Sequence, residues 1–295
     1  MPKLIPVLYK NKQYPNGITP KIQEIAAHFD KTKIKLKPKL EYSLHTEYSY
    51  AKRLMENQIL KDLATIKNGH KNFIPKLWVD KKWSIEFVEF IKNLVHDNPQ
   101  PKIIEIHPPF TDYCTSIDDF LEVYSFFENK IKEVYENVEI LLENRYGTTY
   151  SGGRFLISNT EELVELSRQI DKRDLELKIA LDPPQLITGN KIELLKIVQK
   201  DISRTLESLK TIKHNIKSLH LWGKKIGKTG SFIAHQGDLN TLFSNKQKLK
   251  NMFLFQLTEV LNDNTPRYFV PEVNGKNDDL HSIVNDLLNS GFIFV

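Results

Sequence analysis

The segment Lys102–Asp182 decides the fold class, because three apolar runs alternate in it with two helical stretches. The runs are KIIEIH (Lys102–His107), EILLEN (Glu139–Asn144) and LKIALD (Leu177–Asp182). Their apolar residues are continuous, which is typical of strands covered on both faces, as in a parallel sheet. Between the runs, Ile117–Tyr135 carries apolar residues at three- and four-residue spacing, and Asn159–Ile170 begins with an N-cap followed by acidic residues.

The same alternation extends along the whole chain. Five further strands are predicted at Leu4–Tyr9, Leu40–His45, Phe73–Val79, Lys217–Trp222 and Arg267–Val273. Further helices are predicted at Ile18–Phe29, Ser84–Val95, Ile192–Ile212, Leu242–Leu261 and Leu280–Leu288. Eight strands in 295 residues without a linker predict an α/β protein, a single-domain (β/α)8 TIM barrel over residues 1–295. A doubly wound open sheet is the alternative, and in the barrel the final FIFV should pack against the strands.

Composition narrows the class of protein. Apolar residues make up 40% and charged residues 27%, so disorder of the whole chain is not expected. The sequence has no apolar run long enough to span a membrane and no signal-peptide core. The single cysteine, Cys114, excludes an intrachain disulfide framework and a CxxC zinc site, and a reduced, cytoplasmic protein is expected. The net charge of +5 permits DNA or a phosphorylated small molecule as partner without requiring either.

The ends of the predicted strands carry the candidate site, because TIM-barrel enzymes place their chemistry there. Four consecutive strands bring Glu143, Asp182, His220 and Glu272 to these ends. Converging carboxylates repel one another, and a divalent cation relieves that repulsion. Carboxylate oxygens with one imidazole suit Zn²⁺, Mn²⁺, Mg²⁺ or Fe²⁺. Each residue taken alone could equally be an end-of-strand group that is hydrogen-bonded to loop amides.

These motifs resemble the xylose-isomerase-like TIM-barrel superfamily. That superfamily includes sugar isomerases and epimerases, endonuclease IV-type apurinic-site nucleases and UV damage endonucleases. The resemblance covers roughly residues 100–285 and is strongest in LLENRYGTTYSGGRFLISNTEEL (residues 141–163) and LKIALDPPQLITGN (residues 177–190). It implies that Glu143, Asp182, His220 and Glu272 are metal ligands, and that His107 and His235 serve additional metals as in the nucleases.

The sequence departs from the nuclease pattern at three places. Gln185 stands where Asp-x-x-His has its histidine, and Ile233 stands where the pattern has an aspartate. The segment predicted as strand three, FIPKLWVD (residues 73–80), offers Lys76 or Asp80 but no histidine. One central divalent metal, with a second through His107, is therefore expected in place of a complete trinuclear cluster.

Two reaction types fit such a site. In an isomerase, Glu143 and Glu272 would move a proton off and onto carbon. In a nuclease, the metal would activate water for attack on a phosphodiester. Substrate contacts are predicted for Gln185, Arg145, Trp222, Lys224 and Lys225. Three interpretations follow: an endonuclease IV-type hydrolase acting on damaged DNA, a sugar or sugar-phosphate isomerase or epimerase, and a non-catalytic barrel with a degraded metal site.

Overall fold

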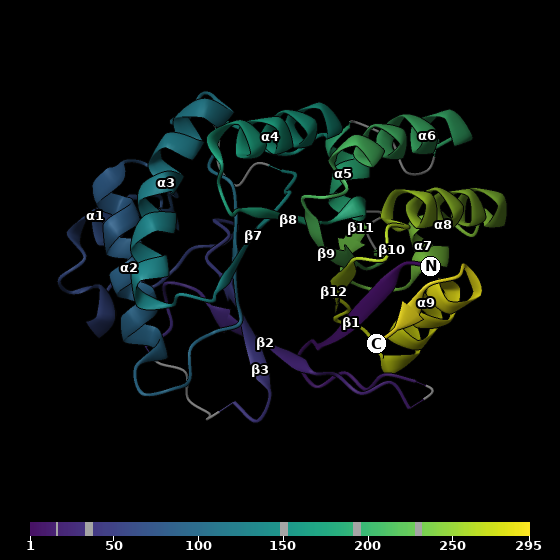
Figure 1. The fold of residues 1–295 in the computed structure, drawn as a ribbon, viewed down its shortest axis with the longest axis horizontal. Coiled ribbons are helices and arrows are strands. Elements are labelled where there is room, and N and C mark those ends of the chain that lie inside the picture. Colours follow the sequence, from purple (N-terminus) through teal and green to yellow (C-terminus); the bar gives the residue numbers. More distant parts are fainter. Residues whose placement is uncertain (16, 33–37, 148–152, 191–195, 228–231) are drawn as a thin grey trace. The chain divides into compact units, whose positions relative to one another are not determined.

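The computed structural model describes residues 1–15, 17–32, 38–147, 153–190, 196–227 and 232–295. Its central sheet is a closed parallel barrel (Figure 1). The barrel strands are β1 (Lys3–Leu8), β2 (Ile22–Ala27), β3 (Glu41–Thr46), β6 (Ile103–Ile106), β7 (Glu139–Glu143), β8 (Lys178–Leu181), β9 (Ile216–Leu221) and β12 (Pro266–Pro271). Neighbours in the sheet follow the order of the chain, and β1 pairs with β12 to close it. The predicted TIM barrel is confirmed.

The chain consists of two compact units, which are described separately. The first unit comprises Met1–Gln23, Asn159–Val164 and Ala180–Val295, and the second comprises Glu24–Ser158 and Glu165–Ile179. Strands β2 and β8 contribute residues to both units. The assignment of residues 1–295 to a single domain stays a prediction.

The second unit packs its helices through aromatic side chains. It contains η1 (Gln58–Leu60), α1 (Ala64–Asn68), α2 (Lys81–Val95), α3 (Ile117–Val134) and most of α4 (Thr160–Arg173), with the hairpin β4 (His70–Lys71) and β5 (Ile74–Pro75). The helices α2 and α3 lie side by side (Figure 1). Asp80 caps α2 by accepting from the Trp83 amide, and Ser116 caps α3 by accepting from the Asp119 amide. The buried Trp78 contacts rings from both helices.

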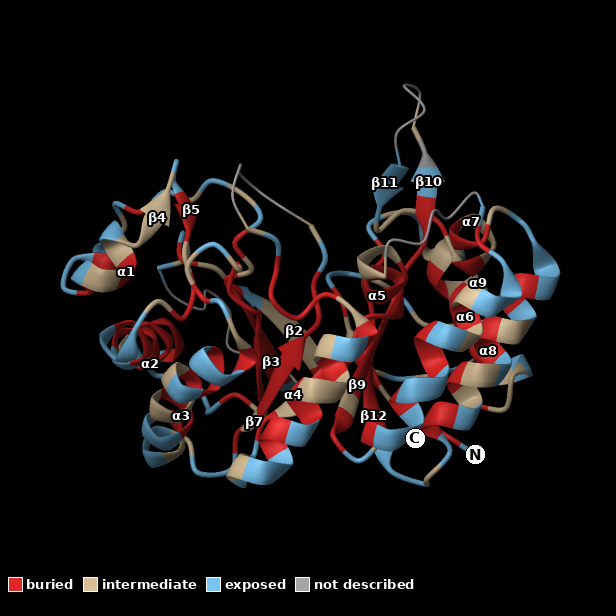
Figure 2. Cartoon of the chain, turned by 90° about the horizontal axis from the view of Figure 1, so that it is seen from above, coloured by how far each residue is buried: buried red, intermediate tan, exposed pale blue. Residues whose placement is uncertain are grey.

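The first unit carries the remaining helices. They are α5 (Pro183–Gly189), α6 (Gln199–Glu207), η2 (Ser208–Ile212), α7 (Leu239–Leu242), α8 (Gln247–Leu261) and α9 (Asn277–Asn289), with the hairpin β10 (Lys224–Ile226) and β11 (Phe232–Ala234). Figure 2 shows α8 and α9 with buried residues on one side and exposed residues on the other. The last strand, β13 (Ile293–Phe294), pairs with β1, so the final FIFV does pack against the barrel. Within the described ranges, no helix is long and apolar enough to cross a membrane.

Two predicted elements are wrong, and the two errors cancel in the strand count. Ile18–Phe29 is not a helix: it contains strand β2, which pairs with β1 because closing the barrel outweighs the helical propensity of IQEIAA. Phe73–Val79 is not a barrel strand: only Ile74–Pro75 is extended, in a two-stranded hairpin. The third barrel strand is therefore Glu41–Thr46, which contains His45. The other seven predicted strands lie in the barrel, shifted by one or two residues at their ends.

Several helix boundaries also differ from the sequence prediction: α2 begins at Lys81, not at Ser84, and α9 covers Asn277–Asn289, not Leu280–Leu288. Asn159–Ile170 is α4, which continues to Arg173. Leu242–Leu261 divides into α7 and α8, separated by Phe243–Lys246. The start of Ile192–Ile212 lies outside the described residues, and the rest of it forms α6 and η2.

The buried Arg267, at the start of β12, binds several groups of the neighbouring loops. The Arg267 guanidinium donates to the backbone carbonyls of Ile216 and Leu261 and to both carboxylate oxygens of Asp263. Although burial opposes it, this bonding lowers the pKa of Asp263 to about 2. The unfolded chain takes up this proton near pH 4, so the stabilisation is complete above about pH 4 and is lost as the pH falls towards 2.

We expect Asp263→Asn to remove this pH dependence. At about pH 6, the free energy of unfolding of the variant should be about 1–2 kcal/mol lower than that of the wild type. This difference should shrink at about pH 2.5. Urea denaturation followed by circular dichroism at the two pH values measures it. The control is Asp30→Asn, because Asp30 is an exposed aspartate. Equal losses for Asp263→Asn at both pH values would contradict the expected role of the ion pair.

Candidate metal centre

Four potential metal ligands meet in the second unit, at the ends of β3, β6 and β7. They are His45, Glu105, His107 and Glu143, all are buried, and one ligand atom from each lies within 4.8 Å of the others. Side chains two apart on a strand share a face, so Glu105 and the residue after β6, His107, point the same way. Two imidazoles with two carboxylates form a donor set that suits Zn²⁺ or Mn²⁺.

His107 and Glu143 form a close contact that either a proton or a metal ion can satisfy. The Nδ1 of His107 lies 3.2 Å from the backbone carbonyl of Glu47, and a neutral ring that donates its proton there leaves Nε2 without one. Burial lowers the pKa of His107 below its ordinary value, against the opposing effect of Glu143, and favours the neutral ring. The Nε2 lone pair of a neutral ring then faces Oε2 of Glu143 at 2.9 Å. Two acceptors at this distance repel unless a proton or a metal ion lies between them.

These two side chains could share a divalent metal ion, because imidazole nitrogen and carboxylate oxygen are ordinary metal ligands. The Nε2 of His107 and Oε2 of Glu143 are 2.9 Å apart, and both side chains are fully buried. This group, which differs from the predicted ligand set, could therefore hold a divalent metal.

His45 is held by carboxylates on neighbouring strands. Its Nδ1 lies 3.0 Å from Oε1 of Glu105 and 3.7 Å from Oε2 of Glu24. Burial opposes a charge on the ring, but the two carboxylates outweigh it and raise the pKa of His45 well above its ordinary value. A histidine whose Nδ1–H is held by a carboxylate offers Nε2 as a ligand, and such partners orient metal-binding histidines. Glu105 therefore fits the role of a positioning residue for His45.

The first unit brings together three other predicted ligands. The Nδ1 of His220 lies 3.6 Å from Oε1 of Glu272, and the Nδ1 of His235 lies 3.3 Å from Oε2 of the same carboxylate. His235 Nδ1 also lies 3.1 Å from the backbone carbonyl of Glu272. Glu272 is thus the centre of a histidine–carboxylate group. That Glu143 shares one cation with Asp182, His220 and Glu272 stays a prediction.

Asp182 has a clear structural role in the first unit. Its Oδ1 accepts from the Gln185 amide at 2.9 Å and caps α5. Its Oδ2 accepts from the Trp222 indole N–H at 2.8 Å. Both oxygens therefore have protein donors, the arrangement expected of an end-of-strand group that is hydrogen-bonded to its loop.

The residues predicted to contact substrate divide between the two units. In the first unit, Trp222 stacks on His235, with ring centroids 4.2 Å apart. The Lys224 amine donates to Thr188 Oγ1. Burial lowers the pKa of Lys224 to about 8, against the opposing effect of Asp182. Lys225 is half exposed, and its amine lies 3.7 Å from Oδ2 of Asp279. In the second unit, Arg145 is buried, with Nη1 3.5 Å from Oε1 of Glu143.

Sequence reasoning left His45 out of the predicted ligand set, although it ends a predicted strand, and missed Glu105. It counted Phe73–Val79 as strand three and looked there for the missing histidine, but Asp80 in that segment caps α2. The signal was present, because His45 lies at the end of a predicted strand and Glu105 lies within KIIEIH. Placing Glu41–Thr46 beside Ile103–Ile106 pairs His45 with Glu105 directly.

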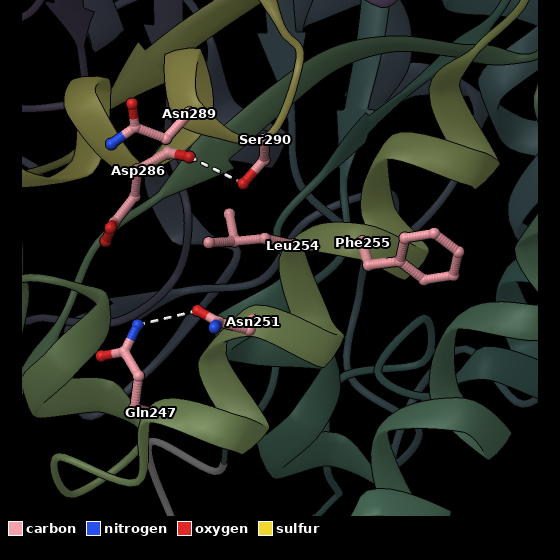
Figure 3. A pocket seen from close by; sticks show the side chains of 7 residues that line it. All are labelled: Gln247, Asn251, Leu254, Phe255, Asp286, Asn289 and Ser290. Carbon is pink, nitrogen blue, oxygen red and sulfur yellow. Dashed lines mark hydrogen bonds between the residues drawn. The ribbon is translucent and has the colours of Figure 1, made fainter.

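A groove of about 470 Å³ lies between α8 and α9 (Figure 3). Its lining residues are Gln247, Asn251, Leu254, Phe255, Asp286, Asn289 and Ser290. Asp286 is bound by the Lys250 amine at 2.7 Å. Among the described residues, this lining contains no imidazole and no second carboxylate, so the groove does not resemble a metal site.

Similarity to known proteins is found among solved structures. No family model matches the chain, and no curated protein sequence matches it. Similar solved structures include a xylose isomerase domain protein from Planctomyces limnophilus, with 14% identity over 73% of this chain and 68% of the other and a TM-score of 0.38. Another is D-psicose 3-epimerase from Clostridium cellulolyticum H10, solved with D-tagatose, with 12% identity over 97% of this chain and 96% of the other and a TM-score of 0.41.

Proposed function

We propose that this protein is a divalent-metal-dependent phosphodiesterase that acts on damaged DNA, with the metal held by His45, His107 and Glu143. The observation that carries the proposal is the 2.9 Å approach of His107 Nε2 to Glu143 Oε2 in a fully buried site. A proton alone could satisfy that contact, but two further ligand residues lie within reach of the same pair. A divalent cation at this site would supply Lewis acidity towards a phosphoryl oxygen.

The protein's own residues have separate tasks in this reaction. Glu105 orients the ring of His45, and the Glu47 carbonyl orients the ring of His107. In the first unit, Glu272 lies near His220 and His235 and is proposed as a group that accepts and releases a proton.

The sugar isomerase or epimerase remains the alternative function. Glu272 could move a proton to or from carbon in that chemistry, and its two histidine neighbours would stabilise either protonation state. A non-catalytic barrel is the third interpretation.

Metal analysis and two activity assays separate these functions. Purified full-length protein is analysed for metals by mass spectrometry, then assayed on abasic and UV-damaged duplexes and on a panel of ketoses and aldoses. Bound metal with strand nicking that is lost on chelation and restored by Zn²⁺ or Mn²⁺ supports the proposal. Bound metal with sugar epimerisation and no nicking overturns it in favour of the alternative. No bound metal, even after dialysis against these ions, indicates the non-catalytic barrel.

A positioning role for Glu105 predicts a specific loss of metal affinity. Glu105→Gln keeps the size of the side chain but removes the charge that orients His45. We expect Zn²⁺ affinity to fall by about 10–100-fold, the usual effect of losing a group that orients a metal ligand. Isothermal titration calorimetry of the chelated protein measures the Kd, and circular dichroism shows whether the fold is kept. A folded variant with wild-type affinity would exclude this role.

A further inference from the structure

Two arginines of the second unit converge on one tyrosine next to the candidate metal centre. Tyr48 follows β3 by two residues, and its ring centroid lies 5.8 Å from that of His107. The guanidinium carbon of Arg53 lies 5.0 Å from the Tyr48 ring centroid, and that of Arg145 lies 4.9 Å from it. Both arginine side chains are about 10% exposed. Two largely buried positive charges therefore lie against the same tyrosine ring.

Each arginine has a carboxylate neighbour that leaves part of its guanidinium unused. Oε2 of Glu47 accepts from Arg53 Nε and from the Phe29 amide, while Oε1 accepts from the amides of Tyr48 and Ser49. Glu47 is thus fully engaged and fixes Arg53 by its Nε. The buried Nη2 of Arg53 has no hydrogen-bond partner among the described residues.

Arg145 also has a guanidinium nitrogen without a hydrogen bond. The Nη1 of Arg145 lies 3.5 Å from Oε1 of Glu143, while its buried Nε has no hydrogen-bond partner in the described part of the chain. In the proposed metal centre, the cation compensates the charge of Glu143, so Arg145 keeps its positive charge for another anion.

From these contacts we infer that Arg53 and Arg145 form a subsite for a phosphoryl group of the substrate. Unsatisfied buried guanidinium nitrogens are costly, and the planar donors of arginine match phosphate oxygens in geometry. Tyr48 supports both guanidiniums and places them beside His107. The inference rests on the proposed function and names the group that its substrate presents next to the metal. A neutral sugar would offer no anionic acceptor to Nη2 of Arg53 and Nε of Arg145.

The test measures binding of inorganic phosphate by calorimetry, with and without chelator. We expect Arg53→Gln and Arg145→Gln each to weaken phosphate binding by about tenfold or more, the loss of a hydrogen bond to a charged group. Arg168→Gln is the control, because Arg168 is exposed on α4 and pairs with Glu165. A second variant, Arg53→Lys, keeps a positive charge next to Glu47 and serves as the test if Arg53→Gln does not fold. It should weaken phosphate binding less than Arg53→Gln does.

The outcomes distinguish this subsite from the metal centre. Dependence on Arg53 and Arg145 in the chelated protein supports the subsite even if no metal ever binds, an outcome in which the proposed function alone fails. Equal phosphate Kd values for Arg53→Gln, Arg145→Gln and the Arg168→Gln control would overturn it. So would phosphate binding that vanishes completely on chelation. Dimethyl phosphate and ribose 5-phosphate, titrated in parallel, distinguish a diester of nucleic acid from a phosphorylated small molecule as the source of the group.

Discussion

Glu143→Gln should abolish metal binding at the cluster and, with it, metal-dependent turnover. The substitution keeps the shape of a fully buried side chain but removes the negative charge opposite His107 Nε2. Losing several kcal/mol of charge stabilisation corresponds to a decrease of about 10³-fold in rate. Metal content by mass spectrometry and single-turnover cleavage of an abasic duplex measure the two effects.

Glu86→Gln is the matched control for this prediction. Glu86 is also a buried carboxylate of the second unit, but it accepts from Thr65 Oγ1 and the Ile66 amide at the start of α1. Its loss should lower stability and leave the metal content unchanged. Retention of metal and activity in Glu143→Gln would place the ion, and the reaction, elsewhere.

Trp78→Ala should cost the most stability of any change considered. Trp78 is 1% exposed, and its ring contacts Trp83, Phe87 and Phe120. Truncating a buried tryptophan typically costs about 3–5 kcal/mol, because the surrounding side chains close the cavity only in part. Urea denaturation of wild type and variant, followed by circular dichroism, measures the difference.

Trp78→Phe separates packing from hydrogen bonding. The Trp78 indole N–H donates to the backbone carbonyl of His107 at 2.7 Å, and phenylalanine cannot replace this bond. We expect Trp78→Phe to cost about 1–3 kcal/mol, the penalty of a buried carbonyl without its donor. If Trp78→Ala and Trp78→Phe were equally stable, the ring contacts of Trp78 would contribute little to the core.

The sequence predicts the barrel well because continuous apolar runs mark buried parallel strands. Lys102–His107, Glu139–Asn144 and Leu177–Asp182 all lie in the barrel. Ile18–Phe29 was misread because IQEIAA has the composition of a helix, and only its partners in the sheet make it a strand. Phe73–Val79 was misread for the opposite reason, since an apolar stretch can also fill a hairpin and a core loop.

The candidate site is predictable only in part, because ligand sets depend on which strands are neighbours. His107 and Glu143 were both identified from strand ends, and the structure brings them into contact. Asp182 was identified in the same way, yet it caps a helix and binds Trp222. Nothing in the local sequence separates a strand-end carboxylate that faces an open ligand position from one that is already bonded to its own loop.

Glu47 contacts both a residue of the candidate metal centre and a residue of the proposed phosphoryl subsite. Its backbone carbonyl orients His107, while its carboxylate fixes Arg53. Zinc and phosphate should therefore bind with positive cooperativity, each reducing the cost of ordering this shared residue for the other. Linkage requires the enhancement to be reciprocal, so saturating phosphate must tighten zinc by the same factor by which zinc tightens phosphate. Paired titrations in both orders measure this factor, and Glu47→Gln should bring it close to one.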